Sequence, residues 1–397
     1  MGFSAQRPTW AEINLDNLTH NFRATRAAVG PGVSIMAAVK SDAYGHGAVD
    51  CAHALEQAGV EWFGVALPEE GLALRESGIA RPILCLGGFW EGQEDSLISH
   101  RLTPVVFRLD LLERLSRSAE AAGTVADYHL KVDTGMGRLG VPCAELGGFL
   151  DQAARFENVR LEGVMTHLAS ADRQEHREFT EKQMDLFESA VELVRSRGFS
   201  PAWIHEANSA GTHAYPRSRG NLVRLGGVLY GLWRDVTDRS IEPLDWRPVM
   251  SLRTRIMHLK TVPAGSPLGY GGTFVTARES RIATLGIGYE DGLRRDLSNR
   301  GKVIVCGQLA PIVGRVSMDL TLVDVTGVPG AGVGDEVVVI GSQGPRVITA
   351  EEVAALAGTI SYEVTCGISD RVPRVYRPDP ARQAGPAAAL YPEKELL

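Results

Sequence analysis

Lys40 and Tyr270 are the two side chains of this 397-residue sequence whose local surroundings suit them best to proton transfer. Lys40 ends the apolar run Val33–Val39 and is followed by Tyr44-Gly45-His46-Gly47. A desolvated amine at the end of a buried strand can hold an aldehyde cofactor as a Schiff base. On spacing alone, Lys40 could equally be a surface lysine whose aliphatic stem packs against the protein.

Tyr270 lies in Leu268-Gly269-Tyr270-Gly271-Gly272-Thr273-Phe274, and the glycines predict a turn. A phenol held in a turn is a candidate acid–base group. Without further context, a loop tyrosine that packs at an interface is the commoner case. The choice between the two interpretations depends on what the rest of the chain supplies.

Further polar groups follow other apolar runs, at the strand ends where barrel enzymes place their sites. The run Tyr128–Val132 contains Lys131 near its end, and Arg138 follows it. The run Leu161–His167 ends on a histidine. Two later runs carry Arg224 and a set of hydroxyl, amide and glycine residues suited to a phosphate group: Asn208, Ser209, Gly226 and Gly227.

The elements that must position these groups are short, uniformly apolar runs, typical of parallel strands buried on both faces. They alternate with segments of helical periodicity, and this favours an eight-stranded parallel (β/α)8 barrel over residues 1–240. A doubly wound open sheet is the alternative on pattern alone. The runs are Val33–Val39, Trp62–Leu67, Ile83–Leu86, Thr103–Phe107, Tyr128–Val132, Leu161–His167, Trp203–His205 and Leu222–Tyr230; the helical segments include Ala48–Ala58, Pro68–Glu76, Leu109–Ala121, Ala144–Ala154 and Glu175–Arg197.

After about residue 240 the pattern changes to strands joined by turns rich in glycine and proline. We therefore predict a separate, mainly antiparallel β-domain over residues 241–380, with one short helix at Ala350–Ala357. Residues 381–397 lack apolar periodicity and are expected to form a loosely held tail. The predicted strands are Met250–Val262, Arg281–Tyr289, Lys302–Val305, Ala310–Val316, Leu320–Val325 and Glu336–Gly341.

Composition narrows the function. A formal charge of −7 argues against binding to nucleic acid or to an anionic membrane, because both need a dense basic surface. The sequence has neither a signal-like start nor an apolar run of membrane-spanning length, so we expect a cytoplasmic protein with a small-molecule substrate. The 5 cysteines are scattered, which predicts free thiols, and no metal site is expected.

Over about residues 8–376 these motifs, in this order, resemble the alanine racemase family of fold-type III pyridoxal-phosphate enzymes. Lys40 with Tyr44-Gly45-His46-Gly47 is similar to the family's cofactor attachment motif. The resemblance implies pyridoxal 5'-phosphate as cofactor, carried on Lys40, with the phosphate bound by Tyr44. It also implies a second, β-rich domain after the barrel.

The same resemblance implies roles for other strand-end residues. Arg138 contacts the cofactor ring oxygen and the substrate, and Lys131 is in many members carbamylated and paired with that arginine. His167 lies beside the ring and orients an arginine or tyrosine. The cofactor phosphate is bound by Asn208, Ser209, Tyr362 and the backbone of Gly226 and Gly227; many members have an aliphatic residue in place of Gly227.

Arg224 corresponds to the arginine that faces the pyridine nitrogen in such racemases. A guanidinium has no acceptor and stays protonated, so it cannot stabilise a proton on that nitrogen as a carboxylate does. The cofactor is then a weaker electron sink. A carbanion at the substrate α-carbon should be reprotonated quickly, which suits racemisation better than transamination.

Racemisation removes a proton from one face and returns it on the other, so two groups on opposite sides are needed. The resemblance assigns the D-isomer to Lys40 and the L-isomer to Tyr270, with Tyr270 supplied by the partner subunit of a homodimer. Met318 and Asp319 correspond to substrate-contacting groups that also cross the dimer. Tyr289, Arg295 and Asp172 would line the access corridor.

The sequence therefore predicts an alanine racemase that supplies D-alanine for peptidoglycan. Three alternatives stay open: a racemase that also accepts serine, a decarboxylase of the same fold, and a non-catalytic barrel that binds pyridoxal phosphate. A decarboxylase should have an acidic residue at the pyridine nitrogen, and Arg224 and Tyr270 argue against it. The long second domain disfavours the non-catalytic barrel.

Overall fold

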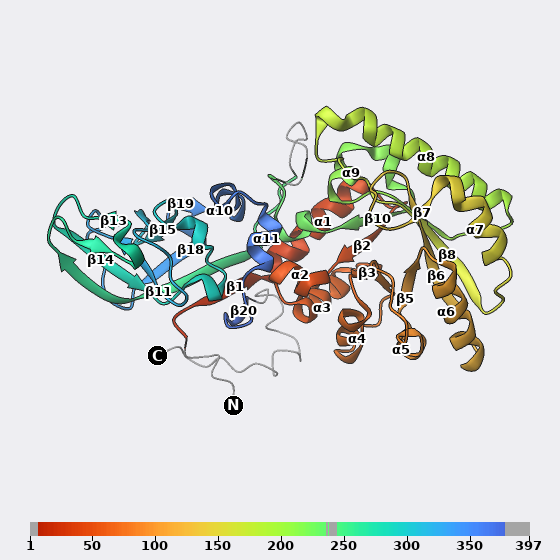
Figure 1. The fold of residues 1–397 in the computed structure, drawn as a ribbon, viewed down its shortest axis with the longest axis horizontal. Coiled ribbons are helices and arrows are strands. Elements are labelled where there is room, and N and C mark those ends of the chain that lie inside the picture. The colour runs from red at the N-terminus through yellow and green to blue at the C-terminus, as the bar shows by residue number, and fades with distance from the viewer. Residues whose placement is uncertain (1–6, 236, 238–243, 378–397) are drawn as a thin grey trace. The chain divides into compact units, whose positions relative to one another are not determined.

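The computed structural model describes residues 7–235, 237 and 244–377 (Figure 1). The chain divides into two compact units, Asn21–Trp246 and a second one made of Met1–His20 with Arg247–Leu397. The predicted first domain, residues 1–240, therefore differs from the structure at its start, because the described residues 7–20 belong to the other unit. The predicted tail, 381–397, lies outside the described residues.

The unit Asn21–Trp246 contains a sheet of eight parallel strands in the order β10-β2-β3-β4-β5-β6-β8-β9. Backbone hydrogen bonds close the seam, from Asn221 to Ile204 (3.1 Å) and from Arg224 to Ala207 (3.0 Å). This order confirms the barrel and excludes the doubly wound sheet. The strands are β2 (Ser34–Ala38), β3 (Trp62–Val65), β4 (Ile83–Cys85), β5 (Thr103–Val106), β6 (Ala126–Asp133), β8 (Val159–Met165), β9 (Trp203–His205) and β10 (Leu222–Leu225), with the short β7 (Val141–Pro142) beside β6.

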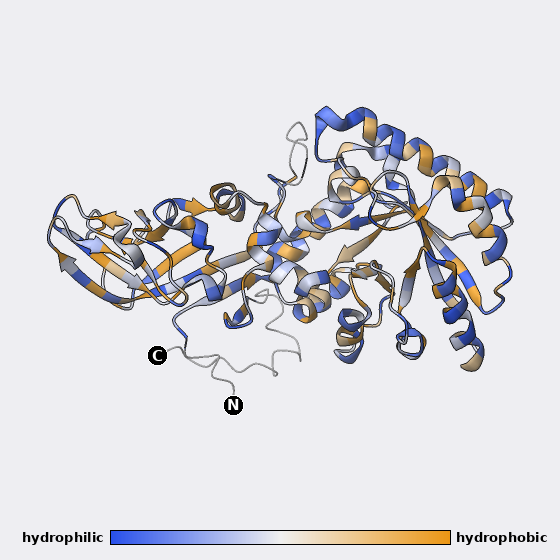
Figure 2. Ribbon diagram, viewed as in Figure 1, coloured by the Kyte–Doolittle hydropathy of each residue, from blue (hydrophilic) through white to orange (hydrophobic). Residues whose placement is uncertain are grey.

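Helices follow most of the strands, and the longer ones turn an apolar side inward. In α6, for example, Leu111, Leu112 and Leu115 are buried. Figure 2 shows apolar residues along the barrel strands and polar residues on much of α8. The helices of the first 246 residues are α1 (Leu15–Val29), α2 (Lys40–Gly45), α3 (Ala48–Ala58), α4 (Pro68–Glu76), α5 (Glu94–Ser99), α6 (Leu109–Ala121), α7 (Leu146–Ala153), α8 (Arg177–Ser196) and α9 (Ser209–Ala214).

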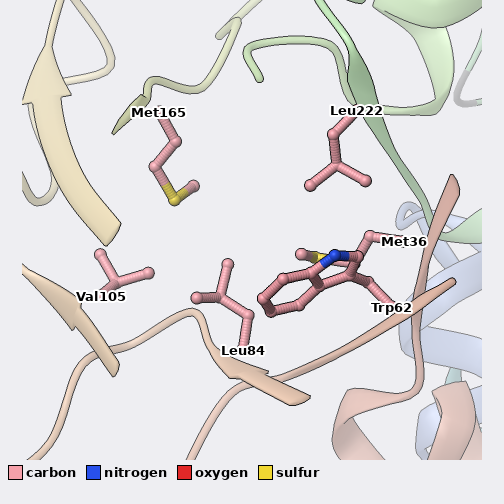
Figure 3. Packing of buried hydrophobic residues seen from close by; sticks show 6 residues of the cluster. All are labelled: Met36, Trp62, Leu84, Val105, Met165 and Leu222. Carbon is pink, nitrogen blue, oxygen red and sulfur yellow. The ribbon is translucent and has the colours of Figure 1, made fainter. Parts of the chain in front are cut away.

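Side chains fill the barrel interior. One cluster joins residues from six different strands, and Figure 3 shows these side chains pointing toward one another. The barrel is therefore a packed core, and ligands must be bound at the strand ends and the loops that follow them. The cluster consists of Met36, Trp62, Leu84, Val105, Met165 and Leu222, with Leu86, Phe107 and Trp203 packed against it.

The second unit is built on a mixed, mostly antiparallel sheet with the path β16-β15-β18-β11-β1-β20. Strand β1 (Trp10–Asn14) pairs antiparallel with β11 and parallel with β20, which ties the start of the chain to this unit. The other strands are β11 (Met250–Val262), β12 (Pro267–Leu268), β13 (Phe274–Val275), β14 (Ser280–Leu285), β15 (Lys302–Val305), β16 (Gln308–Pro311), β17 (Thr321–Asp324), β18 (Glu336–Gln343), β19 (Arg346–Ile348) and β20 (Arg374–Arg377); the helices are α10 (Ala350–Ala357) and α11 (Ser361–Cys366).

Several predicted strands run past the observed ones, and three of them do so by four residues or more. The run Leu222–Tyr230 is a strand only to Leu225, because Gly226 has φ −117° and ψ −106° and a 3-10 turn follows. The run Arg281–Tyr289 ends at Leu285, and Ala310–Val316 ends at Pro311, which lacks the N–H that a ladder needs. Because β10 ends at Leu225, Gly226 and Gly227 lie in the loop that follows it.

The 5 cysteines are all free thiols, as expected. Among the described residues, no helix is both long enough and apolar enough to cross a bilayer. In the same part of the chain, no group of histidine, cysteine and carboxylate side chains is arranged to hold a metal ion.

Candidate active site

Lys40 begins a turn of unusual handedness. Ser41, Asp42, Ala43 and Tyr44 all have positive φ angles, from 52° to 56°, so the chain makes a left-handed helical turn without any glycine in it. For L-residues this conformation costs roughly 1–2 kcal/mol each. Such strain persists only where surrounding contacts impose it, and it concentrates at functional sites.

Those contacts are present. Glu70 on α4 accepts the Ser41 N–H at 2.6 Å, and Asp42 accepts the N–H of Ala48 at 2.7 Å. The buried His46 has Nδ1 at 3.0 Å from the carbonyl oxygens of both Ala43 and Tyr44, so Nδ1 carries the proton and donates it. Contacts from Glu70, Asp42 and His46 thus hold the turn, and the turn itself holds the backbone of Lys40.

The turn delivers Tyr44 to the loop after β10. Its ring packs on that of Tyr230, with the centroids 5.0 Å apart, and Tyr230 donates its hydroxyl to the carbonyl of Ala38 at 2.9 Å. A Cβ placed on Gly226 would lie only 2.4 Å from the Tyr44 hydroxyl oxygen. Glycine at 226 is therefore what allows the hydroxyl to approach this backbone.

Ser209 is buried and accepts the N–H of Gly226 at 2.9 Å, so the loops after β9 and β10 are joined. Asn208 caps α9, accepting from Gly211 at 2.9 Å and donating to the carbonyl of Leu168 at 3.1 Å. Both side chains lie where the sequence predicted. In this structure, however, the amide group of Asn208 and the N–H of Gly226 bind other protein groups.

Arg224 lies on β10 with its guanidinium buried among acceptors. Nη1 donates to the carbonyl of His205 (2.9 Å) and lies 3.1 Å from its Nδ1. Nη2 donates to the carbonyls of Thr166 (2.7 Å) and Glu206 (3.0 Å) and lies 3.3 Å from Nδ1 of His167. Burial lowers the pKa of Arg224 to about 10, so the group keeps its charge at neutral pH. Among contacts of the described residues, its Nε–H is the donor left over.

Lys40, Lys131, Arg138 and Arg224 form a cationic cluster. Burial first, and then the charges of Arg224 and Arg138, lower the pKa of Lys131 to about 8. Burial and the same four cations hold the pKa of His167 well below its ordinary range, so this histidine is neutral. Asp133 is the carboxylate that acts on Lys131, and four cations beside one anion form a site for anionic groups.

Four further residues support this arrangement and were not identified in the sequence: His46, Tyr230, His129 and His205. His46 was visible only as part of the Tyr-Gly-His-Gly motif. The two strand histidines stand in apolar runs, where an interior polar residue is itself a signal, since it must find a partner.

The second unit holds the other predicted residues. Tyr270 starts a 3-10 turn between Gly269 (φ 70°) and Gly271 (φ 72°), and its side chain is 71% exposed. A Cβ on Gly271 would lie 3.1 Å from Nη1 of Arg315, so the Tyr270 turn packs against the segment that leads to Met318. The turn therefore presents the phenol outward from a fixed base.

Met318 and Asp319 lie beside Tyr289. The N–H groups of Tyr289 and Glu290 donate to the carbonyls of Ser317 (3.0 Å) and Met318 (3.1 Å). Asp319 accepts from Arg371 at 2.7 Å. Two separate motifs of the sequence are therefore adjacent in this unit.

Tyr362 lies on α11, whose end contacts the same region. A Cβ on Gly292 would meet the carbonyl oxygen of Gly367 at 2.6 Å, and Arg294 forms an ion pair with Glu363 at 2.9 Å. The loop that begins at Tyr289 thus contacts both the helix that carries Tyr362 and the segment that carries Met318.

A parallel barrel with a lysine on a strained turn, a cationic cluster, and a loop of hydroxyl and amide groups defines a class of enzyme that binds an anionic cofactor at its strand ends. Two family models match the chain: the alanine racemase N-terminal domain over residues 13–233 and the C-terminal domain over residues 249–376. The chain belongs to the alanine racemase family.

Individual relatives agree. The alanine racemase of Syntrophobacter fumaroxidans is 46% identical over 363 residues, which cover 91% of this chain and 95% of that protein. The crystal structure of alanine racemase from Streptomyces lavendulae has a TM-score of 0.87 at 37% identity, covering 96% of this chain and 99% of that one. The Bartonella henselae alanine racemase structure, described as having covalently bound pyridoxal phosphate, has a TM-score of 0.84 at 30% identity, covering 93% and 99%.

The family, the two-part fold and the class of enzyme, a pyridoxal-phosphate-dependent isomerase, are thus confirmed. The residues fit the cofactor: an amine for its aldehyde, cations for its negative charge, and Tyr44 and Ser209 for its phosphate. The roles of the individual residues remain predictions.

The close approach of Tyr44 to Gly226 gives a test of the phosphate loop. Gly226→Ala would place a methyl group against the Tyr44 hydroxyl and displace it, because 2.4 Å is far below contact distance. We expect the dissociation constant for pyridoxal phosphate to rise about tenfold or more, measured by absorbance titration of the apoprotein.

Gly148→Ala is the matched control, since a Cβ there has no atom within 4 Å. It should leave the affinity unchanged. Equal affinities for the Gly226→Ala variant and the wild type would show that Tyr44 does not bind the phosphate from this position.

Proposed function

We propose that this protein interconverts L-alanine and D-alanine on pyridoxal phosphate held by Lys40, with Tyr270 as the second acid–base residue. When bound, the cofactor withdraws electrons from the substrate α-carbon and so acidifies its proton. The observation that carries the proposal is the cationic cluster around Lys40, in which Arg224 and Lys131 are both buried.

Arg224 decides which reaction the site supports. Its protonated guanidinium can only donate hydrogen bonds, and its Nη groups are already bound to carbonyls and imidazoles. The Nε–H is the donor that the contacts of the described residues leave for a ligand. A donor at the pyridine nitrogen keeps that nitrogen unprotonated, which limits charge delocalisation and favours return of a proton to the substrate.

Two residues move the proton. By the family resemblance, Lys40 takes or returns it on the D side and Tyr270 on the L side. The left-handed turn fixes the backbone at Lys40, while the glycine-flanked turn presents Tyr270 outward from its unit. Arg138 and the neutral His167 would orient substrate and cofactor. Met318 and Asp319 would contact the substrate, and Tyr362 the phosphate.

Incubation of L-alanine in deuterated water tests this function. The wild type should eliminate optical rotation, place deuterium at the α-carbon and release no carbon dioxide; carbon dioxide release would indicate the decarboxylase alternative. Tyr270→Phe should keep the absorbance band of the bound cofactor but lower racemisation in both directions by about 10²–10⁴-fold. The substitution removes only the proton-bearing oxygen.

Tyr376→Phe, at a tyrosine of β20 in the same unit, serves as control and should racemise normally. Near-normal racemisation by Tyr270→Phe would refute the two-base assignment. A panel with both enantiomers of serine decides whether the enzyme is selective for alanine.

A homodimer with shared sites is the assembly that we propose. In a single chain Tyr270 is 71% exposed and Met318 is 51% exposed, although both are proposed to contact substrate. Large exposed side chains with a proposed function are typical of a surface that another subunit covers.

Mixed dimers of two inactive variants test the sharing. When Lys40→Ala and Tyr270→Phe chains are unfolded together and refolded, half of the dimers are heterodimers, each with one site that has both residues. About one quarter of the wild-type activity should therefore return. The two variants refolded separately are the controls. No recovery would show that Lys40 and Tyr270 act within one chain.

Lys131 is the proposed site of carbamylation. It is 4% exposed, and its pKa of about 8 leaves more neutral amine at neutral pH than an ordinary lysine has. A neutral amine adds carbon dioxide to form a carbamate, whose negative charge would pair with Arg138 in the cationic cluster. The modification would thus replace a repulsive contact by an attractive one.

With ¹³C-bicarbonate, we expect a carbamate signal in the NMR spectrum that grows as the pH rises from 7 to 9, because the neutral amine increases as the pH passes about 8. Lys131→Arg should abolish the signal, and Lys302→Arg, at an exposed lysine, should preserve it. A signal unaffected by Lys131→Arg would place the carbamate elsewhere.

Membership of the family also suggests where the enzyme acts and what its product is used for. We propose a cytoplasmic enzyme whose D-alanine enters peptidoglycan synthesis. Growth of a racemase-deficient bacterium without added D-alanine would test the supply.

A further inference from the structure

A line of polar side chains runs from Arg224 through the barrel interior. Nδ1 of His205 lies 3.1 Å from Nη1 of Arg224, and Nε2 of His205 lies 2.8 Å from Nδ1 of His129. Nε2 of His129 in turn lies 3.5 Å from Oε2 of Glu162. Both imidazoles are fully buried, whereas the Glu162 side chain is 21% exposed. The line therefore connects the buried arginine to a carboxylate at the protein surface.

The protons in this line can point in one direction only. Arg224 has only donors, so Nδ1 of His205 must accept and its proton must be on Nε2. That proton is donated to Nδ1 of His129, which leaves the proton of His129 on Nε2, toward Glu162. Burial favours the neutral form of both rings. If either ring changed tautomer, two N–H groups would face each other.

The barrel is shaped around the inner histidine. Gly163 on β8 pairs with His129 on β6, and a Cβ at Gly163 would lie 2.7 Å from the imidazole. The ring of Trp62 contacts His129 with the centroids 5.3 Å apart, so the surroundings are largely apolar. A buried imidazole in such surroundings costs stability unless its nitrogens are paired. His205 pairs with Nδ1 of His129, whereas Nε2 has only the 3.5 Å contact with the Glu162 carboxylate and no closer hydrogen-bond partner among the described residues.

We propose that His129 and Glu162 are positioning residues that fix the tautomer of His205 and thereby hold the Arg224 guanidinium toward the cofactor ring. This inference rests on the proposed function, because it assumes that Arg224 faces the pyridine nitrogen. The Glu162 carboxylate, 3.5 Å from Nε2 of His129, favours the proton on that nitrogen, and His129 transmits this preference to His205. A displaced guanidinium would allow protonation of the ring nitrogen, which strengthens the electron sink.

The consequence is a change in how the reaction partitions. With a stronger electron sink, more substrate is lost to half-transamination, in which alanine and the cofactor aldehyde become pyruvate and the cofactor amine. A residue that only filled space in the barrel would affect stability but not this ratio. The ratio of pyruvate formed to racemisation turnovers therefore separates positioning from packing.

Two substitutions at His129 differ in whether they keep a hydrogen-bond acceptor for His205. His129→Leu removes the acceptor for His205, whereas His129→Asn offers an amide oxygen near the place of Nδ1. We expect His129→Leu to raise the ratio of pyruvate to racemisation about tenfold and to lower kcat with little change in KM. The absorbance band of the bound cofactor should also change its pH dependence. His129→Asn should stay within about threefold of the wild type.

Glu162→Gln tests the far end at a partly exposed position, where folding is least affected. It should raise the same ratio about threefold, because a neutral amide holds the His129 proton less strongly. Asp127→Asn is the control: Asp127 is a carboxylate on β6, the strand of His129, but it accepts from Arg160 at 2.7 Å, so its loss should leave the ratio unchanged. If His129→Leu does not fold, Glu162→Gln decides.

Histidine-selective ¹⁵N NMR of the full chain without cofactor gives a readout independent of activity. The wild type should show the Nε2–H tautomer for His205, and His129→Leu should show a mixture. An unchanged tautomer and an unchanged partition ratio in folded His129→Leu, or an unchanged ratio in Glu162→Gln, would overturn the inference. Absence of racemisation in the wild type would instead refute the proposed function.

Discussion

The burial of one charge, the guanidinium of Arg224, is the constraint on which the barrel site depends. Removing a cation from water costs several kcal/mol unless acceptors replace the lost hydration. The carbonyl groups of Thr166, His205 and Glu206 replace it, and they belong to the ends of β8 and β9. The backbone of Arg224 also closes the barrel seam through Ala207. The interactions that close this side of the barrel are therefore the same ones that place its central charge.

That charge also sets the chemistry of its neighbours. Burial is the main cause that lowers the pKa of His167, His205 and Lys131, and the charge of Arg224 lowers all three pKa values further. Neutral imidazoles accept hydrogen bonds, and a lysine with a lowered pKa is available as a nucleophile. The cluster stays cationic as a whole, so an anionic ligand relieves repulsion that the folded protein otherwise carries. Binding and catalysis thus use one electrostatic arrangement rather than separate ones.

The sequence predicted the site residues that lie at strand ends. It did not predict the features that form only through contacts between distant side chains. Lys40 and Arg224 were identifiable because they follow or occupy apolar runs that end at a barrel rim. The left-handed turn after Lys40 was not, since Ser41-Asp42-Ala43-Tyr44 contains no glycine to announce positive φ angles. One of the contacts that hold it comes from Glu70, a residue of another helix, which accepts the Ser41 N–H. Strand β1 was not predicted at all, and its residues were assigned to the barrel domain, because its partner β11 begins more than two hundred residues later in the sequence.

The two proposed bases are supported in different ways, and this difference suits their tasks. Lys40 must return to one position after every turnover, and its turn is fixed by contacts that offset the strain of four residues. In the proposed mechanism, Tyr270 stands across the substrate from Lys40 and must still let substrate enter. Glycines take the positive φ angles of its turn, so little strain is stored there, and the contact with Arg315 fixes the turn from behind. We expect a change in the glycines to alter the position of the Tyr270 phenol, and a change at Glu70 to alter the turn that carries Lys40, the proposed cofactor attachment residue.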